Sequence, residues 1–440
     1  MIDILSDRTF RNMWLAQVAA LFGTGLATVA LALLAYDLAG GQASLVLGTV
    51  FTIKMVAYVC IAPVASALAE RLPRRRVLVG LDIVRCAVAL LLPFVTQTWQ
   101  VYVLIAVLQV AAAGFTPIYQ ATIPDILPEE DRYTKALSLS RLAYDLEAMI
   151  SPALAAVLLS VVSASALFGG TALGFAASAV LIFSVALPHP AQGERRGIFE
   201  RTTRGTKIYL ATPRLRGLLA FNVAIAMAGA MVLVNTVLIV QGTLGLQEGA
   251  VAVVMAAFGA GSMVAALALP RVLERLGDRP VMSFGAFLMG ASLLALALHV
   301  SQSGWGQWAL MLAWFGVGVG FSTVLTPSGR LLRRSAQEAD RPAIFAAQFA
   351  LSHACWLFGY PLAGWLATAF SPLVSLVLLG VLCLAALGAA RWLWPADDPA
   401  EIAHSHPDLP PDHPHLRDHH AAHSHTFRID DLHPQWPRPG

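Results

Sequence analysis

The sequence predicts an all-α membrane protein in which twelve transmembrane helices form two six-helix, pseudo-symmetric halves. Of its 440 residues, 57% are hydrophobic and only 12% are charged, whereas soluble domains carry roughly 25% charged residues. Uncharged runs such as 217–247 are far longer than the ~20 apolar residues that cross a bilayer. A repeat of roughly 200 residues, much longer than the periods of soluble repeat arrays, divides the chain into two similar halves.

Apolar runs separated by polar breaks locate the individual spans. We expect the first six helices at 12–38, 44–69, 77–96, 100–124, 134–161 and 165–187. The second six are expected at 216–241, 247–270, 281–300, 305–329, 342–368 and 372–394.

The distribution of cations predicts the orientation of these spans. Lys and Arg occur in the even-numbered loops and in the central connection, whereas the odd-numbered loops, near residues 40, 98, 163, 244, 303 and 370, contain none. Positively charged loops stay in the cytoplasm. We therefore expect a multi-pass protein of the bacterial inner membrane with both termini in the cytoplasm. The basic residues follow topology, so no nucleic-acid partner is expected.

The repeat predicts four segments. Residues 1–187 form the N-terminal half, 188–215 a cytoplasmic central linker, 216–394 the C-terminal half and 395–440 a disordered His-rich tail. Glu70 to Arg75 match Glu274 to Arg279 in the loop after the second span of each half. Two six-span parallel repeats are typical of secondary transporters, which bind their substrate near the membrane midplane between the halves.

The loop after the second span resembles a signature of the major facilitator superfamily. Residues 66–76 read SALAERLPRRR and are similar to the pattern G-x-x-x-D-R-x-G-R-R, although Ser, Glu and Pro replace the first Gly, the Asp and the second Gly. The stretch Ile-Pro-Asp-Ile-Leu-Pro at 123–128 is similar to the exporter branch of that family. The resemblance implies the major facilitator fold and a conformational role for this loop and its repeat, carried by Glu70, Arg71, Arg74, Arg75, Glu274 and Arg275.

The tail has a different composition from the rest of the chain. Residues 395–440 contain nine His and nine Pro, a composition that buries too little apolar surface to fold alone. Neutral imidazole binds nickel, copper and zinc, and His-x-His spacing on a flexible chain lets two rings reach one ion. The predicted metal ligands are His404, His406, His413, His415, His419, His420, His423, His425 and His433.

Twelve spans together with this tail resemble the nickel-resistance exporters of the Nre type. That resemblance implies transport of Ni²⁺, and in some cases Co²⁺. Ligand chemistry alone equally allows Zn²⁺ or Cu²⁺. We expect these ions as cargo at the tail and between the halves, and no tightly bound cofactor.

Charged residues at membrane depth are candidates for transport chemistry. Asp145 and Glu147 lie near the middle of span five, and Lys54 lies in the middle of span two. Arg141 is four residues before Asp145, a spacing that favours a local ion pair. Glu147 has no such local partner, which favours a role in proton coupling. Lys54 could neutralise either carboxylate or repel a cation.

Polar residues in both halves add candidates for the cavity wall. Gln17 matches Asn222 in the repeat, and His353 in span eleven matches Tyr144 in span five. Glu147 and His353 on opposing halves would form a transient metal or proton site. The alternative for His353 is a core histidine that bonds a neighbouring carbonyl.

We therefore predict a monomeric, proton-coupled exporter of divalent cations, nickel first and cobalt next, that confers metal resistance. It is not an enzyme, because no nucleophile–base arrangement appears. One alternative is an exporter of organic molecules such as drugs or siderophores, favoured by an aromatic-rich cavity without convergent ligands. The other is a metal sensor or buffer that does not transport.

Overall fold

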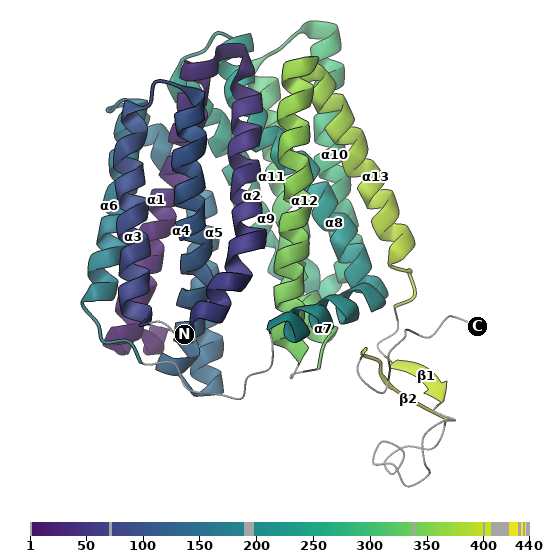
Figure 1. Ribbon diagram of the computed structural model, residues 1–440. Helices are drawn as coiled ribbons and strands as arrows, with labels where there is room; N and C mark the ends of the chain where they lie inside the picture. Colours follow the sequence, from purple (N-terminus) through teal and green to yellow (C-terminus); the bar gives the residue numbers. More distant parts are fainter. Residues whose placement is uncertain are drawn as a thin grey trace.

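The computed structural model describes residues 2–69, 73–188, 198–337, 340–398, 401–405, 422–429, 433 and 436. Within this part of the chain, twelve long helices form the bundle, one for each predicted span (Figure 1). The N-terminal half consists of α1 (Arg8–Ala39), α2 (Ala43–Ala69), α3 (Arg74–Leu91), α4 (Thr98–Ile126), α5 (Glu130–Leu159) and α6 (Ala164–Phe183). The C-terminal half consists of α8 (Pro213–Val237), α9 (Glu248–Arg275), α10 (Asp278–Ser303), α11 (Gln307–Arg334), α12 (Arg341–Ala369) and α13 (Pro372–Leu393).

Several helices begin or end at residues suited to those positions. The Asp7 carboxylate accepts a hydrogen bond from the Phe10 amide at 2.9 Å and caps α1. The Ser371 hydroxyl caps α13 in the same way, since short oxygen-bearing side chains satisfy the free amides of a first turn. Gly40 ends α1 with φ 51°, a left-handed backbone that glycine adopts readily. Short 3-10 turns η1 (Ile2–Ser6), η2 (Gly40–Gln42) and η3 (Leu92–Phe94) and a π-helical turn η4 (Leu238–Thr243) complete the ends.

Several helices run past the predicted spans at the ends that the cation pattern assigns to the cytoplasm. α5 begins at Glu130 and not at 134, α9 continues to Arg275, and α11 continues to Arg334. Backbone hydrogen bonds continue after the apolar run ends, so charged residues there form the last helical turns in water. By length and composition, ten described segments could cross a membrane, the first of which, 8–61, covers both α1 and α2.

α5 contains more charged residues than any other long helix. Arg141, Asp145 and Glu147 all lie within it. A charged helix in a membrane bundle is tolerated where it faces protein or water, and α5 packs on α1 and on α9 of the opposite half.

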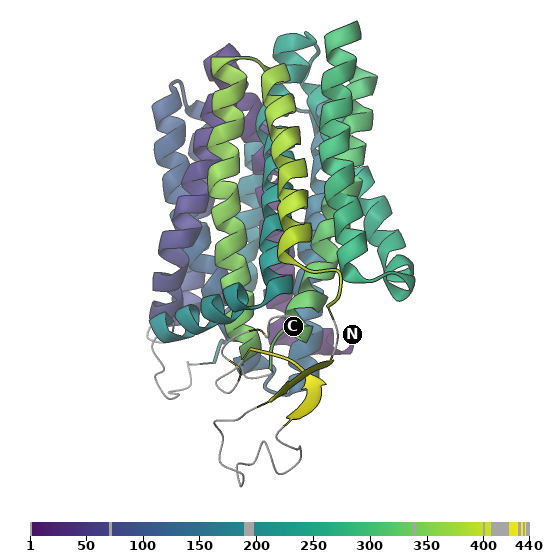
Figure 2. The same cartoon turned by 90° about the vertical axis from the view of Figure 1, so that its right-hand side faces the viewer.

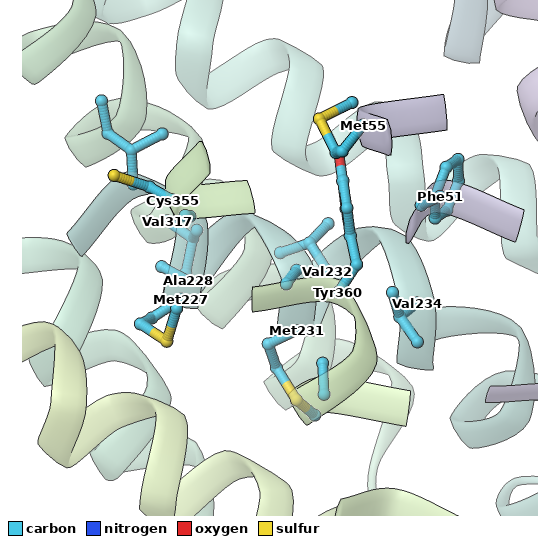
Figure 3. Packing of buried hydrophobic residues seen from close by; sticks show 14 of the residues in the cluster. Phe51, Met55, Met227, Ala228, Met231, Val232, Val234, Val317, Cys355 and Tyr360 are labelled. Carbon is cyan, nitrogen blue, oxygen red and sulfur yellow. The ribbon is translucent and has the colours of Figure 1, made fainter. Parts of the chain in front are cut away.

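The halves meet along two helix pairs, α2 with α12 and α5 with α9. Figure 1 shows α2 and α12 side by side at the centre of the bundle. Gly48 permits this close crossing, since a Cβ there would lie 2.8 Å from the Tyr360 carbonyl oxygen. The rings of Phe51 and Tyr360 pack with centroids 4.8 Å apart, beside Met55 and the α8 residue Met231 (Figure 3).

The predicted linker contains a helix, α7 (Ile198–Ala211), that the span analysis did not anticipate. Figure 2 shows it lying across the end of the bundle. Arg204 pairs with Asp340 at 2.6 Å, and the Tyr209 hydroxyl donates to Gln348 Oε1 at 2.5 Å. Burial raises the pKa of the Tyr209 phenol, so its proton remains available for this bond. These contacts fasten α7 to the start of α12, so this helix packs on the C-terminal half.

The tail, predicted to be disordered, contains two short antiparallel strands, β1 (Glu401–Ser405) and β2 (Ala422–Thr426). Phe427 and Ile429 follow β2 and are buried. These two apolar residues hardly change the average composition of the tail. That average therefore did not predict a folded segment there. The hairpin lies at the same end of the bundle as α7 (Figure 1).

Candidate functional site

Three of the predicted ionisable residues meet at the interface of the halves. Lys54 lies in the middle of α2, Glu147 in the middle of α5 and His353 near the middle of α12. Electrostatic interactions connect Lys54 to both Glu147 and His353. We call Lys54, Glu147 and His353 the interface triad. It places a cation, a carboxylate and an imidazole at membrane depth, with contributions from both halves.

A glycine on α1 makes room for the Glu147 carboxylate. A Cβ at Gly25 would lie 2.7 Å from Glu147 Oε1 and would also collide with the Ser151 hydroxyl. Ser151 lies one turn after Glu147 on α5 and is buried. The carboxylate is therefore held against the α1 backbone, and a larger residue at position 25 would displace it.

His353 has two environments at once. Its Nδ1 lies 2.7 Å from the Phe349 carbonyl oxygen of its own helix, the bond expected of a core histidine. Its ring also stacks on Tyr58 of the opposite half, with centroids 5.5 Å apart and planes at 11°. The backbone bond orients the imidazole, and the stack joins α12 to α2.

The His353 ring belongs to an aromatic stripe along one face of α12. Phe349, His353, Trp356 and Tyr360 follow one another at helical spacing, and neighbouring rings are in contact at 4.0 Å for the first pair and 4.8 Å for the last. Gly229 of α8 leaves space for the Trp356 ring. Of the four residues in this stripe, only His353 was predicted as a site residue. The signal that could have revealed the others is the spacing of four, three and four residues between them.

Tyr144 connects the triad to polar groups inside the N-terminal half. It shares a side-chain hydrogen bond with Gln17 and interacts electrostatically with Tyr58, Glu147 and Arg85. The Tyr144 side chain is 36% exposed, although it lies on the same helix as Glu147.

Behind Tyr144, a buried ion pair neutralises Arg85. Asp82 and Arg85 of α3 pair with each other, and the Ser178 hydroxyl of α6 donates to Asp82 at 2.7 Å. The rings of Phe115 and Phe175 lie 4.1 and 4.6 Å from the guanidinium carbon. Buried charges that are paired in this way stabilise a fixed arrangement. We therefore assign this pair to the framework of the site.

Gln17 and Asn222, matched by the repeat, occupy equivalent positions low in α1 and α8. Both are buried, at 5% and 4% exposure. Gln17 Oε1 and Asn222 Nδ2 make no hydrogen bond within the described part of the protein. Each amide thus has one buried polar atom without a partner in the described part of its half.

Some predicted residues lie outside what the structure describes. The side chains of Arg141 and Asp145 do so, and their predicted ion pair is untested. Glu70 and Arg71 lie outside the described residues, as do His406, His413, His415, His419 and His420. Of the remaining tail histidines, His404, His423 and His425 lie in the two strands, and His433 is buried.

Within the part of the chain that the structure describes, no three His, Cys, Asp or Glu residues form a group that could hold a metal ion. The interface triad itself contributes one carboxylate and one imidazole, together with a lysine. A cationic ammonium group beside these two ligands opposes the binding of a divalent ion. The site is therefore better suited to a proton than to a metal.

The arginines of the loop after α2, for which the family resemblance implies a conformational role, bind at helix ends. Arg74 pairs with Asp125 near the end of α4. Arg75 donates to the Phe183 carbonyl oxygen at the end of α6, and its guanidinium lies 4.5 Å from that ring.

In the second half, the predicted Glu274 and Arg275 are exposed at the end of α9. The pair equivalent to Arg74 and Asp125 is formed instead by Asp278 and Arg330, whose Nε lies 3.0 Å from Asp278 Oδ1. Asp278 is the repeat mate of Arg74, so the alignment of the halves contained this signal.

The sequence profile of the Major Facilitator Superfamily matches residues 13–225 and 218–417, one match for each half. The chain belongs to the Major Facilitator Superfamily. It is therefore a multi-pass secondary transporter and not an enzyme, as the repeat predicted.

Two relatives within the superfamily are efflux proteins by name. Macrolide efflux protein A of Streptococcus pyogenes is 24% identical over 184 residues, which are 41% of this chain and 45% of that protein. Macrolide efflux protein A of Enterococcus faecalis is 26% identical over 136 residues, 30% of this chain and 42% of that protein. The matches thus span less than half of the length of these curated relatives. They give no support to the predicted resemblance to nickel exporters.

A crystal structure of the nucleoside transporter NupG superposes with a TM-score of 0.67 over 88% of this chain and 98% of that one. At 13% identity, this similarity concerns the fold alone. It agrees with the arrangement of two six-helix halves described above.

Proposed function

We propose that this superfamily member is a proton-coupled exporter of amphipathic organic molecules in the inner membrane of a bacterium. The observation that carries the proposal is the aromatic stripe of α12 beside the interface triad. Aromatic rings with few polar groups are the usual lining of a site for small organic molecules. The partial similarity to macrolide efflux proteins supports the same substrate class.

In this proposal, Glu147 is the proton carrier. When the Glu147 carboxylate on α5 is ionised, it attracts the Lys54 ammonium group on α2. A proton taken up by Glu147 from the outside neutralises the carboxylate and removes that attraction. Lys54 is then released toward His353, and the α2–α12 contact is reorganised. Proton binding and helix arrangement are thereby linked, as alternating access requires.

Export of nickel or cobalt is the second candidate, and the nine tail histidines are the observation that favours it. Its weakness is the triad, in which the Lys54 ammonium group opposes a divalent cation beside the carboxylate and imidazole that would bind it. In this second reading the tail concentrates cytosolic metal ions, and the same carboxylate carries the proton.

One experiment separates the two candidates. The full chain, its Glu147→Gln variant and a chain truncated after Trp394 are expressed in bacteria that lack their major efflux systems. Cellular accumulation is then measured for a radiolabelled macrolide, a lipophilic cationic dye, nickel, cobalt and zinc. We expect the full chain to lower the macrolide or dye, Glu147→Gln to abolish that effect, and truncation to leave most of it.

Lower nickel or cobalt with unchanged organic compounds would establish the metal candidate instead. If truncation alone removed that activity, the essential chemistry would lie in the tail. If organic accumulation stayed unchanged in every strain while the protein was present in the membrane, the main proposal would be wrong.

A further inference from the structure

Two glycines that the repeat places at equivalent positions each lie against a side chain on the fifth helix of their half. Gly25 of α1 lies against the Glu147 carboxylate of α5, and its repeat mate Gly229 of α8 lies against the Trp356 indole of α12. The same repeat relates Trp356 to Glu147. In the C-terminal half, the indole therefore occupies the place that the proposed proton carrier occupies in the N-terminal half.

Trp356 begins a row of aromatic rings that crosses three helices of the C-terminal half. Its indole lies 4.8 Å from the Tyr360 ring on α12 and 6.4 Å from the Phe321 ring on α11, measured between ring centroids. The Phe321 ring in turn lies 5.6 Å from the Phe258 ring on α9. Aromatic pairs at these separations are in favourable contact, so the row holds the indole from the side of α11.

The stripe residues before and after Trp356 both contact the N-terminal half. The His353 ring stacks on Tyr58, and the Tyr360 ring packs on Phe51, both on α2. Trp356 lies between them in the stripe and is only partly buried. Its indole therefore faces the same interface between the halves, with α8 behind it.

The lack of a side chain at Gly229 determines how far the indole lies from that interface. A Cβ at this position would lie 2.3 Å from Trp356 Cη2 and 3.0 Å from Cζ3. Carbon atoms in van der Waals contact are roughly 3.5–4.0 Å apart, so a methyl group here would displace the ring by more than about 1 Å. Because α8 and Phe321 close the other directions, the ring would move toward the N-terminal half.

We propose that Trp356 is a specificity-determining contact of the cargo, and that Gly229 sets the largest cargo the protein accepts by letting the indole lie back against α8. This inference rests on the proposed export of amphipathic organic molecules. A flat indole contributes a large apolar contact to a ligand, and a wall that shifts by a methyl group discriminates between ligands of different size. The pair therefore admits a bulky cargo such as a macrolide, for which a displaced indole would leave too little room.

The test compares a bulky and a small cargo in bacteria that lack their major efflux systems. Accumulation of a radiolabelled macrolide and of a small lipophilic cationic dye is measured with the full chain and with Gly229→Ala. The matched control, Gly359→Ala, also disturbs the α8–α12 contact, because its Cβ would lie 2.9 Å from the Ala226 carbonyl oxygen. The Trp356 ring is not among the atoms nearest to that Cβ. The rescue variant combines Gly229→Ala with Trp356→Phe, since the smaller ring leaves room for the added methyl group.

A second measurement follows the indole without any transport. The purified full chain is labelled with fluorotryptophan, and the fluorine resonance of Trp356 is assigned by its loss in Trp356→Phe. The relaxation of this resonance by a water-soluble nitroxide reports how far the ring projects from α8 toward the opposite half.

We expect Gly229→Ala to lower macrolide export relative to dye export at least roughly tenfold, the usual effect of one methyl group on the fit of a ligand. Gly359→Ala should leave the ratio of the two exports unchanged, and the rescue variant should restore it. The nitroxide should relax the Trp356 resonance more strongly in Gly229→Ala than in the unaltered protein or in Gly359→Ala.

A ratio that falls equally in Gly229→Ala and Gly359→Ala would overturn the role of Trp356 in specificity, and so would an equal loss of both exports in Gly229→Ala. Unchanged relaxation of the Trp356 resonance in Gly229→Ala would overturn steric control by Gly229, whatever the cargo is. If the unaltered chain exported neither compound, the proposed function would be wrong, and the cargo role of Trp356 with it. The nitroxide measurement would still decide whether Gly229 positions the ring.

Discussion

The two halves contain the same ion pair, with its charges reversed, between the start of their third helix and the end of their fourth. In the N-terminal half, Arg74 at the start of α3 pairs with Asp125 near the end of α4. In the C-terminal half, Asp278 at the start of α10 pairs with Arg330 near the end of α11. The equivalent positions are conserved in geometry while the sign of each charge is exchanged. An attraction between the start of the third helix and the end of the fourth is therefore what the fold requires.

At membrane depth the halves differ in kind. Lys54, Glu147 and the Asp82–Arg85 pair all belong to the N-terminal half. In the C-terminal half, His353 is the residue of the interface triad, and the Asn235 amide near the end of α8 donates to Ser375 at 3.1 Å. The shared scaffold thus carries unequal chemistry, with the proposed proton carrier in one half and the aromatic stripe in the other.

Removal of the lysine should have the largest effect on transport. Lys54→Met leaves the Glu147 carboxylate without its counter-charge in an apolar environment, which is costly. We expect transport to fall at least roughly tenfold, since the carboxylate then stays protonated and cannot cycle. Uptake into everted membrane vesicles under an imposed pH gradient measures this directly.

The double variant Lys54→Met with Glu147→Gln serves as its control for folding. Removing both partners of an ion pair costs less stability than removing one. The double variant should therefore be at least as stable as Lys54→Met while remaining inactive. Transport retained by Lys54→Met would mean that the coupling does not use this pair.

The next effect comes from reversing one charge of the loop pair. Arg74→Asp places two carboxylates together and should destabilise the protein by about 1–3 kcal/mol, less than for a fully buried pair because Asp125 is 25% exposed. The exchange Arg74→Asp with Asp125→Arg reproduces the order found in the other half. It should recover most of the loss in thermal unfolding of the purified protein.

The matched exchange in the other half is Asp278→Arg with Arg330→Asp. Because Arg330 is 50% exposed, its single reversals should cost less than Arg74→Asp. If neither exchange recovered stability, the sign of each charge would matter beyond the pair, and the comparison of the halves would fail.

The sequence predicted the fold because its signals are local. Apolar runs defined the twelve helices, and the cation pattern placed their polar ends. Glu147, Lys54 and His353 stood out because ionisable residues at depth are rare. Their helices could be named, but which helices meet depends on packing between the halves. The Tyr58–His353 stack and the contact of Gly25 with Glu147 could therefore not be predicted from the sequence.

The tail and the loops show a second limit. Composition predicted a disordered segment, yet Phe427 and Trp436 suffice to dock part of it on Arg214. In the second half, Glu274 and Arg275 were predicted because they match the family's loop pattern, and both are exposed. Asp278 was overlooked because a carboxylate replaces the arginine of the pattern, and only the partner Arg330 explains that replacement.

A smaller effect is expected at the histidine of the C-terminal half. His353→Gln keeps a hydrogen-bonding group but removes the ring that stacks on Tyr58, an aromatic contact worth about 1 kcal/mol. We expect transport to fall roughly two- to fivefold, by the same free energy. His353→Phe restores the stack without the imidazole nitrogen. Recovery in His353→Phe would assign the role to packing, whereas continued loss would assign a proton to the imidazole.

The smallest effect should come from the arginines that bind helix ends. Arg75 donates to the Phe183 carbonyl at the end of α6, and Arg279 donates to the Trp394 carbonyl at 2.7 Å and the Arg391 carbonyl at 3.1 Å at the end of α13. Arg75→Gln and Arg279→Gln should each lower stability by about 1 kcal/mol, the net value of such bonds. Only Arg279 holds the segment from which the tail departs, so Arg279→Gln should also speed amide exchange at residues 422–429. Equal exchange in the two variants would mean that contacts other than those of Arg279 fix the base of the tail, and the two helix-end arginines would then be equivalent.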